Sequence, residues 1–341
     1  MQALFDVVLP VFAIVAAGYA CGWKRLLGGE SSEALNGFVY WVALPALLFK
    51  AMASVDLAEV WNAPFLAAFA GASVATWVIA SIVGRKVFRL DAAEAALHGL
   101  NGAYPNSGFM GIPLAIAAYG EEAALPAIVA AVISVLSVAL AVVPIEIARP
   151  GTSRLLPLIG RVMGALARNP MIVAPCAGLA WSSTGLGLFG SIQTFTGILG
   201  AAAGPCALFS IGLFLVGKPL REGSAEIAAM TFAKLIVHPL LTAFAILVLF
   251  PTDPLWATVA ILSAALPIGS GPFVLAQATG IYVRRTSTVM LATTVASVVT
   301  ISVFSHLPHR PITLGPDNLW IIDRQARRPS VLAAGKEPGA P

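Results

Sequence analysis

The chain has 341 residues, of which 58% are hydrophobic and 11% are charged, and its mean hydropathy is +0.89. A soluble globular domain carries about 25% charged residues, so the composition indicates an integral membrane protein and excludes a soluble one. The net charge of +4 does not indicate nucleic-acid binding, because the basic residues lie in short segments between apolar runs.

Ten apolar segments are candidates to cross a bilayer, since about 20 apolar residues span the hydrocarbon core. These segments, spans 1 to 10, are 3–22, 34–54, 63–88, 93–119, 123–147, 168–184, 190–216, 225–250, 255–280 and 285–306. The N-terminus carries Asp6 and no basic residue, which argues against a cleaved signal peptide. The sequence therefore predicts an all-α integral membrane protein with ten transmembrane helices.

The loops between the spans alternate in charge. Every loop after an odd-numbered span holds basic residues: Lys24, Arg25, Arg85, Lys86, Arg89, Arg149, Arg154, Arg161, Arg168, Lys218, Arg221, Arg284 and Arg285. The opposite loops hold Asp56, Glu59, Glu121, Glu122 and Asp253, and neither Lys nor Arg. By the positive-inside rule, both termini lie outside the cytoplasm, in a multi-pass protein of the inner membrane. The basic tail after residue 306 is the exception to this pattern.

Prolines and glycines reveal an internal repeat. Residues 10–18 of span 1 match 170–178 of span 6, and 45–49 of span 2 match 205–209 of span 7, at one offset of 160 residues. An offset of five spans inverts the second copy in the membrane, which is typical of secondary transporters. The predicted organisation is a five-helix repeat over 1–147, a cytoplasmic basic linker over 148–167, an inverted five-helix repeat over 168–306, and a polar, partly disordered tail over 307–341.

Spans 4 and 9 carry helix-breaking residues in mid-span. Span 4 reads NGAYPNSGFMGIP over 101–113, and span 9 reads ALPIGSGPF over 265–273. Proline removes a backbone donor and glycine weakens a helix, while unwound backbone in a bilayer must lie inside protein or beside a wet cavity. We therefore expect two broken helices that cross near the bilayer centre, where helix N-termini favour an anionic group. The alternative is a pair of proline-kinked helices packed closely through glycine.

These breaks supply most of the candidate substrate-binding residues. The side chains of Asn106, Ser107 and Ser270 would form hydrogen bonds with a carboxylate. The other candidates are Asn101, Pro105, Gly108, Pro267, Gly269, Gly271 and Lys50. Lys50 in span 2 would attract an anion, or alternatively its ammonium would extend to the membrane interface.

Span 8 carries two ionisable residues, Lys234 and His238, one helical turn apart. Because ionisable groups inside a membrane are candidates for function by default, we assign both to ion or proton coupling. Lys234 would offset the C-terminal ends of the half-helices or pair with a substrate carboxylate; the alternative is a structural pairing with a backbone carbonyl. His238 would carry a proton, since histidine titrates near neutral pH, or would be a hydrogen-bonded structural residue. No metal and no cofactor are expected, and the coupling ion, H⁺ or Na⁺, stays open.

The motifs resemble those of the auxin efflux carrier family, whose bacterial members include malonate-transporter-like proteins. The resemblance rests on Tyr104–Pro113, Leu266–Ala276 and Ala43–Phe49, and covers about residues 1–306. It implies a five-plus-five inverted-repeat fold, with a scaffold of spans 1, 2, 6 and 7 and a transport domain of spans 3–5 and 8–10. It also implies a carboxylate substrate bound by Asn106. Many relatives have a second asparagine where this chain has Gly271, so substrate contacts to span 9 do not carry over directly.

The sequence also bears on competing functions. It contains no GxxxxGK[ST], HExxH or GxSxG motif and no acidic residue in mid-span, which disfavours an ATP-driven pump, an embedded enzyme, a carboxylate-ringed channel and an aspartate-dependent antiporter. We expect a secondary transporter that moves a small organic anion, such as malonate, by alternating access. The alternative is an ion-coupled symporter or antiporter of the bile-acid and sodium type.

The expected partners are the substrate and the lipid bilayer, with no nucleic acid. Two glycine pairs, Gly18/Gly22 and Gly200/Gly204, are spaced for close helix packing in the scaffold. A homodimer through the same spans stays open.

Overall fold

The computed structural model of the chain describes residues 2–55, 60–148, 167–217 and 224–304, together with residues 160, 163 and 164. Most of the predicted linker over 148–167 and the whole predicted tail over 307–341 lie outside the described residues. The acidic pair Asp56 and Glu59 and the basic pair Lys218 and Arg221 lie outside them as well.

The described residues fold almost entirely into helices, and their one β-type pairing is an isolated bridge. The helices are α1 (Gln2–Trp23), α2 (Gly29–Phe38), η1 (Val39–Ala43), α3 (Leu44–Met52), α5 (Ala63–Lys86), α6 (Ala92–Ala103), η2 (Ser107–Gly111), α7 (Ile112–Tyr119), η3 (Glu121–Ala123), α8 (Ala124–Ser137), α9 (Ala139–Ala148), α11 (Pro170–Ser182), α12 (Gly190–Ala201), α13 (Ala203–Leu215), α14 (Ser224–Phe232), η4 (Ala233–Val237), α15 (His238–Phe244), η5 (Ala245–Leu249), α16 (Pro254–Ala265), α17 (Gly271–Thr279) and α18 (Val283–Phe304).

Among the described residues, five helical stretches are long and apolar enough to cross a membrane: Gly29–Met52, Ala63–Lys86, Glu121–Ile147, Gly190–Leu215 and Ala225–Leu249. Shorter apolar helices cover Phe12–Trp23, Ser107–Tyr119, Pro170–Ser182 and Pro254–Ala265, which overlap predicted spans 1, 4, 6 and 9. The all-α membrane class is therefore confirmed, and the arrangement as ten spans in two inverted repeats stays a prediction.

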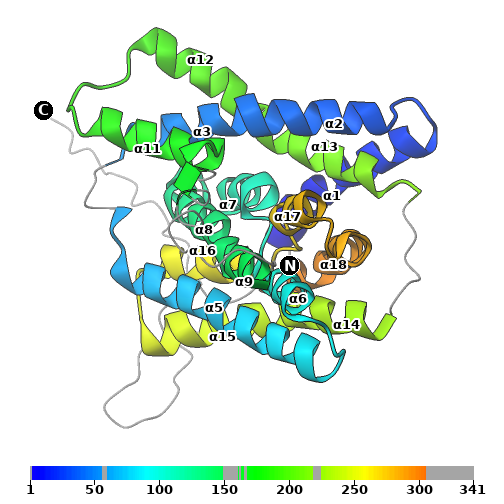
Figure 1. The fold of residues 1–341 in the computed structure, drawn as a ribbon. Helices are drawn as coiled ribbons and strands as arrows, with labels where there is room; N and C mark the ends of the chain where they lie inside the picture. Colours follow the sequence, from blue (N-terminus) through cyan, green and yellow to red (C-terminus); the bar gives the residue numbers. More distant parts are fainter. Residues whose placement is uncertain are drawn as a thin grey trace, which may run out of the picture.

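The helices gather into two groups. The first helix group consists of α1–α3 and α11–α13, in which α1 packs against α13 and α3 packs against α11 and α12. The second helix group consists of α5–α9 and α14–α18, in which α5 packs against α6 and α15, and α16 packs against α8. Figure 1 shows the first group across the top of the view, α5, α14 and α15 at the bottom, and α7, α8 and α17 between them.

Glycine lets helices of the first group come close. A Cβ placed on Gly18 of α1 would overlap the backbone oxygen of Phe209 in α13, and one on Gly200 of α12 would lie 3.1 Å from Cα of Leu47 in α3. The predicted role of these glycines in helix packing is confirmed, since small residues allow such backbone approach. A homodimer contact stays a prediction.

Polar side chains cap the N-termini of three helices in the second group. Asn62, Asp91 and Asp253 each accept a hydrogen bond from a first-turn backbone N–H of α5, α6 and α16, at 2.8–3.0 Å. Asp91 also forms a capping box with Glu94. Such caps supply acceptors for N–H groups that the helix itself leaves unpaired.

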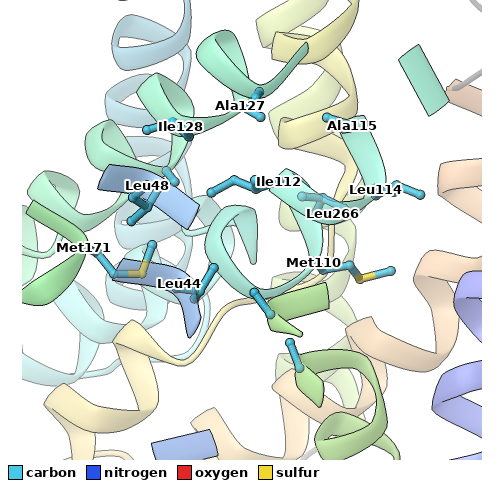
Figure 2. Close-up of a cluster of buried hydrophobic side chains, with 14 of the residues drawn as sticks. Leu44, Leu48, Met110, Ile112, Leu114, Ala115, Ala127, Ile128, Met171 and Leu266 are labelled. Carbon is cyan, nitrogen blue, oxygen red and sulfur yellow. The ribbon is translucent and has the colours of Figure 1, made fainter. Parts of the chain in front are cut away.

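The two groups meet through apolar side chains. Leu44 and Leu48 of α3 and Met171 of α11 belong to one buried cluster with Met110 and Ile112 of the span 4 helix, and Figure 2 shows these residues together. Hydrogen bonds join helices inside each group instead. Examples are Ser32 to the carbonyl of Ser210 in the first group, at 3.1 Å, and Asn62 to Thr252 in the second, at 2.9 Å.

Candidate functional site

Span 4 is interrupted between α6 and η2. Tyr104 is extended, with φ −91° and ψ 106°, and Asn106 has φ −79° and ψ 52°. A residue that precedes proline is disfavoured in the helical region, so Pro105 ends α6 at this point. The helix resumes with a π turn, in which the N–H of Gly111 donates to the carbonyl of Asn106 at 3.0 Å.

Span 9 is interrupted for the same reason. Leu266 precedes Pro267 and is extended, with φ −65° and ψ 156°. The helix resumes at Gly271, with Ser270 at its N-cap. Both interruptions lie where the sequence predicts them.

The two breaks pair with each other. Pro105 and Ile268 form an isolated antiparallel bridge. The N–H of Asn106 donates to the carbonyl of Pro267 at 2.8 Å, and the N–H of Gly269 donates to the carbonyl of Tyr104 at 3.3 Å. The unwound backbone thus finds partners inside the protein, as a bilayer environment requires.

A third segment supports this pairing from α18. The N–H of Ile268 donates to Oγ1 of Thr293 at 3.2 Å, and both residues are at most 1% exposed. The central residue of the bridge is therefore hydrogen-bonded by a side chain that the sequence analysis did not single out.

Asn106 lies at the N-cap of the helix that begins with η2. Its side chain is only 7% exposed and makes no capping hydrogen bond. The first N–H groups of a helix have no acceptor within the helix. The N–H groups of Ser107, Gly108 and Phe109 also have no acceptor in any other described segment. A buried amide and an open helix N-terminus therefore lie together, which is an arrangement that suits an anion.

The other candidates from span 4 are placed around this point. Oγ of Ser107 lies 3.4 Å from Oγ of Ser134 in α8. A Cβ on Gly108 would lie 2.5 Å from Cε of Met171, so this glycine faces the first helix group. Asn101, before the break, donates from Nδ2 to Oγ1 of Thr286 at 3.0 Å, while its buried Oδ1 has no partner among the described residues.

The candidates from span 9 form the facing side. The carbonyl of Pro267 accepts from Asn106, and Gly269 donates to Tyr104. Ser270 is half-buried and makes no capping hydrogen bond. Gly269 and Gly271 both lie against the Tyr104 ring. The breaks thus bring the candidates of spans 4 and 9 together.

Lys50 lies in a different environment. Its Nζ is 3.2 Å from the position that a Cβ on Gly197 of α12 would take. The structure therefore places the Lys50 ammonium against a helix of the first group.

Lys234 and His238 form a buried chain of hydrogen bonds, and both are 0% exposed. Nζ of Lys234 donates to the carbonyl of Ala264 at 2.6 Å and lies 3.2 Å from Nδ1 of His238. Nε2 of His238 lies 3.2 Å from Oγ of Ser73, which donates to the carbonyl of Phe69. Because the single proton of the Ser73 hydroxyl goes to Phe69, Ser73 accepts from Nε2–H, and Nδ1 is left as the acceptor for Lys234.

These linked hydrogen bonds reach the backbone beside the second break. Ala264 lies in the last turn of α16, two residues before the unwound segment, and carbonyl groups at a helix C-terminus carry partial negative charge. Lys234 itself lies in the π turn η4, a distortion often found at functional sites. The coupling roles of both residues stay predictions.

Sequence reasoning missed several residues of this region. Ser73 and Thr293 are buried hydroxyls with long-range partners, but serine and threonine are common in membrane helices and nothing in the pattern marks these two. Glu226 is buried as well; it accepts from the Tyr282 hydroxyl and pairs with Arg285 at 3.0 Å. That cluster ties α14 to the start of α18.

A cavity of about 440 Å³ lies between the two helix groups. Its lining consists of Ala51, Val55, Glu121, Glu122, Ala124, Leu125, Leu255 and Trp256. None of the candidate binding residues contributes to it.

The sequence matches the family described as "Membrane transport protein" over residues 3–305. It is 34% identical over 305 residues to a protein of Rhizobium meliloti (strain 1021) named "Putative malonate transporter", covering 89% of this chain and 95% of the relative. It is 27% identical over 300 residues to "Uncharacterized transporter YfdV" of Escherichia coli (strain K12), covering 84% and 92%. The family and these relatives are transporters and not enzymes. This chain therefore belongs to the family of membrane transport proteins, and its resemblance to the auxin efflux carriers is confirmed.

Proposed function

We propose that this protein is a secondary transporter that moves a small organic carboxylate across the inner membrane by alternating access. The observation that supports this proposal most directly is the buried Asn106 amide at an open helix N-terminus, held in place by the paired breaks. Within the part of the chain that the structure describes, this amide has no hydrogen-bond partner. The name of the Rhizobium meliloti relative makes malonate the first substrate to test.

The chemistry of binding follows from the groups at the break. A carboxylate would accept hydrogen bonds from Nδ2 of Asn106 and from the free N–H groups at Ser107 to Phe109. Hydrogen bonds to a charged group are stronger than neutral ones, and the helix N-terminus adds a favourable field. Ser107 and Ser270 provide further hydroxyls, and Lys234 supplies a positive charge behind the second break, where the C-terminal carbonyl of Ala264 would otherwise repel an anion.

The movement that we propose is a displacement of the second helix group against the first. In this proposal the chain has ten spans in two inverted repeats. The first helix group is the scaffold, the second is the transport domain, and both termini lie outside the cytoplasm. The apolar contact of Met171 with Gly108 and of Leu44 and Leu48 with Met110 and Ile112 supports this division, because apolar surfaces can slide without breaking hydrogen bonds.

The proposal is tested by uptake into proteoliposomes. The probes are radiolabelled malonate and a set of small monocarboxylates, with imposed gradients of H⁺ or Na⁺ in separate arms. The expected result is saturable uptake that Asn106→Ala abolishes. The ion whose gradient accelerates uptake is the coupling ion. Asn36→Ala is the matched control, since Asn36 accepts a hydrogen bond from Ser210 within the first helix group. Absence of uptake of every carboxylate by correctly folded protein would contradict the proposal.

A further inference from the structure

We propose that Tyr104 is a specificity-determining residue, which occupies the second half of the substrate site and selects carboxylates that carry a further oxygen-bearing group. This inference rests on the proposed function, because it concerns the substrate of the same site. It adds a residue that the resemblance does not assign.

The ring of Tyr104 lies directly over two glycines of the second break. A Cβ on Gly271 would lie 2.5 Å from Cζ and 2.7 Å from the hydroxyl oxygen of Tyr104, and a Cβ on Gly269 would lie 2.7 Å from Cε1. Real Cβ atoms essentially never approach other atoms within 3.0 Å. An asparagine at position 271 and the observed tyrosine ring therefore cannot occupy this space together.

The position of the ring is fixed on both sides. Pro105 holds the Tyr104 backbone extended, and the side chain packs against the buried cluster that includes Leu97 and Leu100 of α6 and Ala276 of α17. Tyr104 therefore lies between α6 and α17, and its ring takes the place that a polar side chain at position 271 would have.

The two helix N-termini at the breaks are consequently unequal. The helix at Asn106 begins with Ser107, Gly108 and Phe109, each of which has a backbone N–H. At the start of α17, Pro272 has no N–H, and the Tyr104 ring fills the space beside Gly271. The helix N-terminus at Asn106 thus offers a carboxylate more backbone donors than the start of α17 does.

The second half-site presents a neutral donor instead. The phenolic hydroxyl of Tyr104 has no hydrogen-bond partner among the described residues, and the side chain is half-buried. A hydroxyl in this position suits a second oxygen atom of the substrate, such as the other carboxylate of malonate or a hydroxyl or keto oxygen next to the bound carboxylate. A plain monocarboxylate such as propionate has no group to accept from it.

The placement of the ring is tested first, without any substrate, by a double-mutant cycle in melting temperature. Gly271→Ala is expected to lower the melting temperature in the wild-type background and to have little effect in a Tyr104→Ala background, where the obstructing ring is gone. Gly71→Ala is the control, since a Cβ there meets no atom within 4 Å. An equal effect of Gly271→Ala in both backgrounds would overturn the placement.

The selectivity is tested by transport of malonate and propionate by Tyr104→Phe, which keeps the ring and removes the hydroxyl. The ratio of malonate to propionate uptake at low concentration is expected to fall about tenfold, which corresponds to about 1.4 kcal/mol, with propionate uptake unchanged. Tyr40→Phe is the matched control, since the Tyr40 hydroxyl donates to Asn169 in the first helix group. An unchanged ratio would overturn the role of the hydroxyl. If the wild-type protein carries neither compound, this selectivity fails, and uptake of the wider set of carboxylates decides the proposed function separately. The double-mutant cycle in melting temperature still decides where the ring lies.

Discussion

Nζ of Lys234 donates a hydrogen bond of 2.6 Å to the carbonyl oxygen of Ala264, in the last turn before the second break. The fully buried amino group of Lys234 is thereby fixed at the negative end of a half-helix. The contact agrees with both hypotheses drawn from the sequence, in which Lys234 offsets a helix C-terminus or pairs with a backbone carbonyl. The two differ in whether the charge matters for transport.

Lys234→Gln separates the charge from the hydrogen bond, because glutamine can still donate to the Ala264 carbonyl. If the charge favours a bound anion, malonate uptake at low concentration should fall at least about tenfold, equivalent to about 1.4 kcal/mol. Lys24→Gln, at an exposed position, should transport like the wild type. Uptake by Lys234→Gln that equals the wild type at every pH would contradict a functional charge.

His238 is hydrogen-bonded at both ring nitrogens, to Lys234 and to Ser73, which favours its structural role over a role as proton carrier. His238→Gln should lower the melting temperature, because a buried group left without its partner costs about 1–3 kcal/mol. If an imposed proton gradient drives uptake by the wild type, it should also drive uptake by His238→Gln. Loss of that response, with transport otherwise intact, would instead assign proton coupling to His238.

A disulfide between the two helix groups should stop transport. A Cβ on Gly204 of α13 lies 3.0 Å from Cβ of Pro113 in α7, and a disulfide needs about 3.5–4.5 Å between the two Cβ atoms, so a small shift accommodates it. In a background with Cys21, Cys176 and Cys206 replaced, Pro113→Cys/Gly204→Cys should lose uptake on oxidation and regain it on reduction.

The matched control for this crosslink lies within the second helix group. A Cβ on Gly102 of α6 lies 2.9 Å from Cβ of Ala80 in α5, so Ala80→Cys/Gly102→Cys should form a disulfide that leaves transport intact. Gel mobility before and after reduction would verify both crosslinks. Full activity of the oxidised Pro113→Cys/Gly204→Cys protein would contradict relative movement of the groups.

Thr293→Val should destabilise the paired breaks. It leaves the buried N–H of Ile268 without its acceptor, at a cost of about 1–3 kcal/mol. Thr294→Val is the neighbouring control, since the Thr294 hydroxyl donates to Met290 within its own helix. Melting in detergent should show a larger loss for Thr293→Val, and equal losses would mean that the Ile268 hydrogen bond adds no stability.

The sequence by itself determined the class of the protein and the places where its helices break. The apolar composition decides that the protein lies in a membrane. Pro105 and Pro267 end α6 and α16, because proline restricts the backbone of the residue before it. These effects are local, and a local pattern is sufficient to predict them. The spacings Gly18/Gly22 and Gly200/Gly204 likewise indicated close helix packing, though not the partners of these residues.

Only the tertiary structure decided which groups meet. The bridge between Pro105 and Ile268, the wedge of Tyr104 over Gly271, and the contact of Lys234 with Ala264 join distant segments, while Lys50 lies against α12. The direction of a buried side chain follows from the packing of all its neighbours, and the pairing of unwound backbone follows from the need to satisfy every polar group away from water. Both conditions apply to the folded molecule as a whole, so no single stretch of sequence contains them.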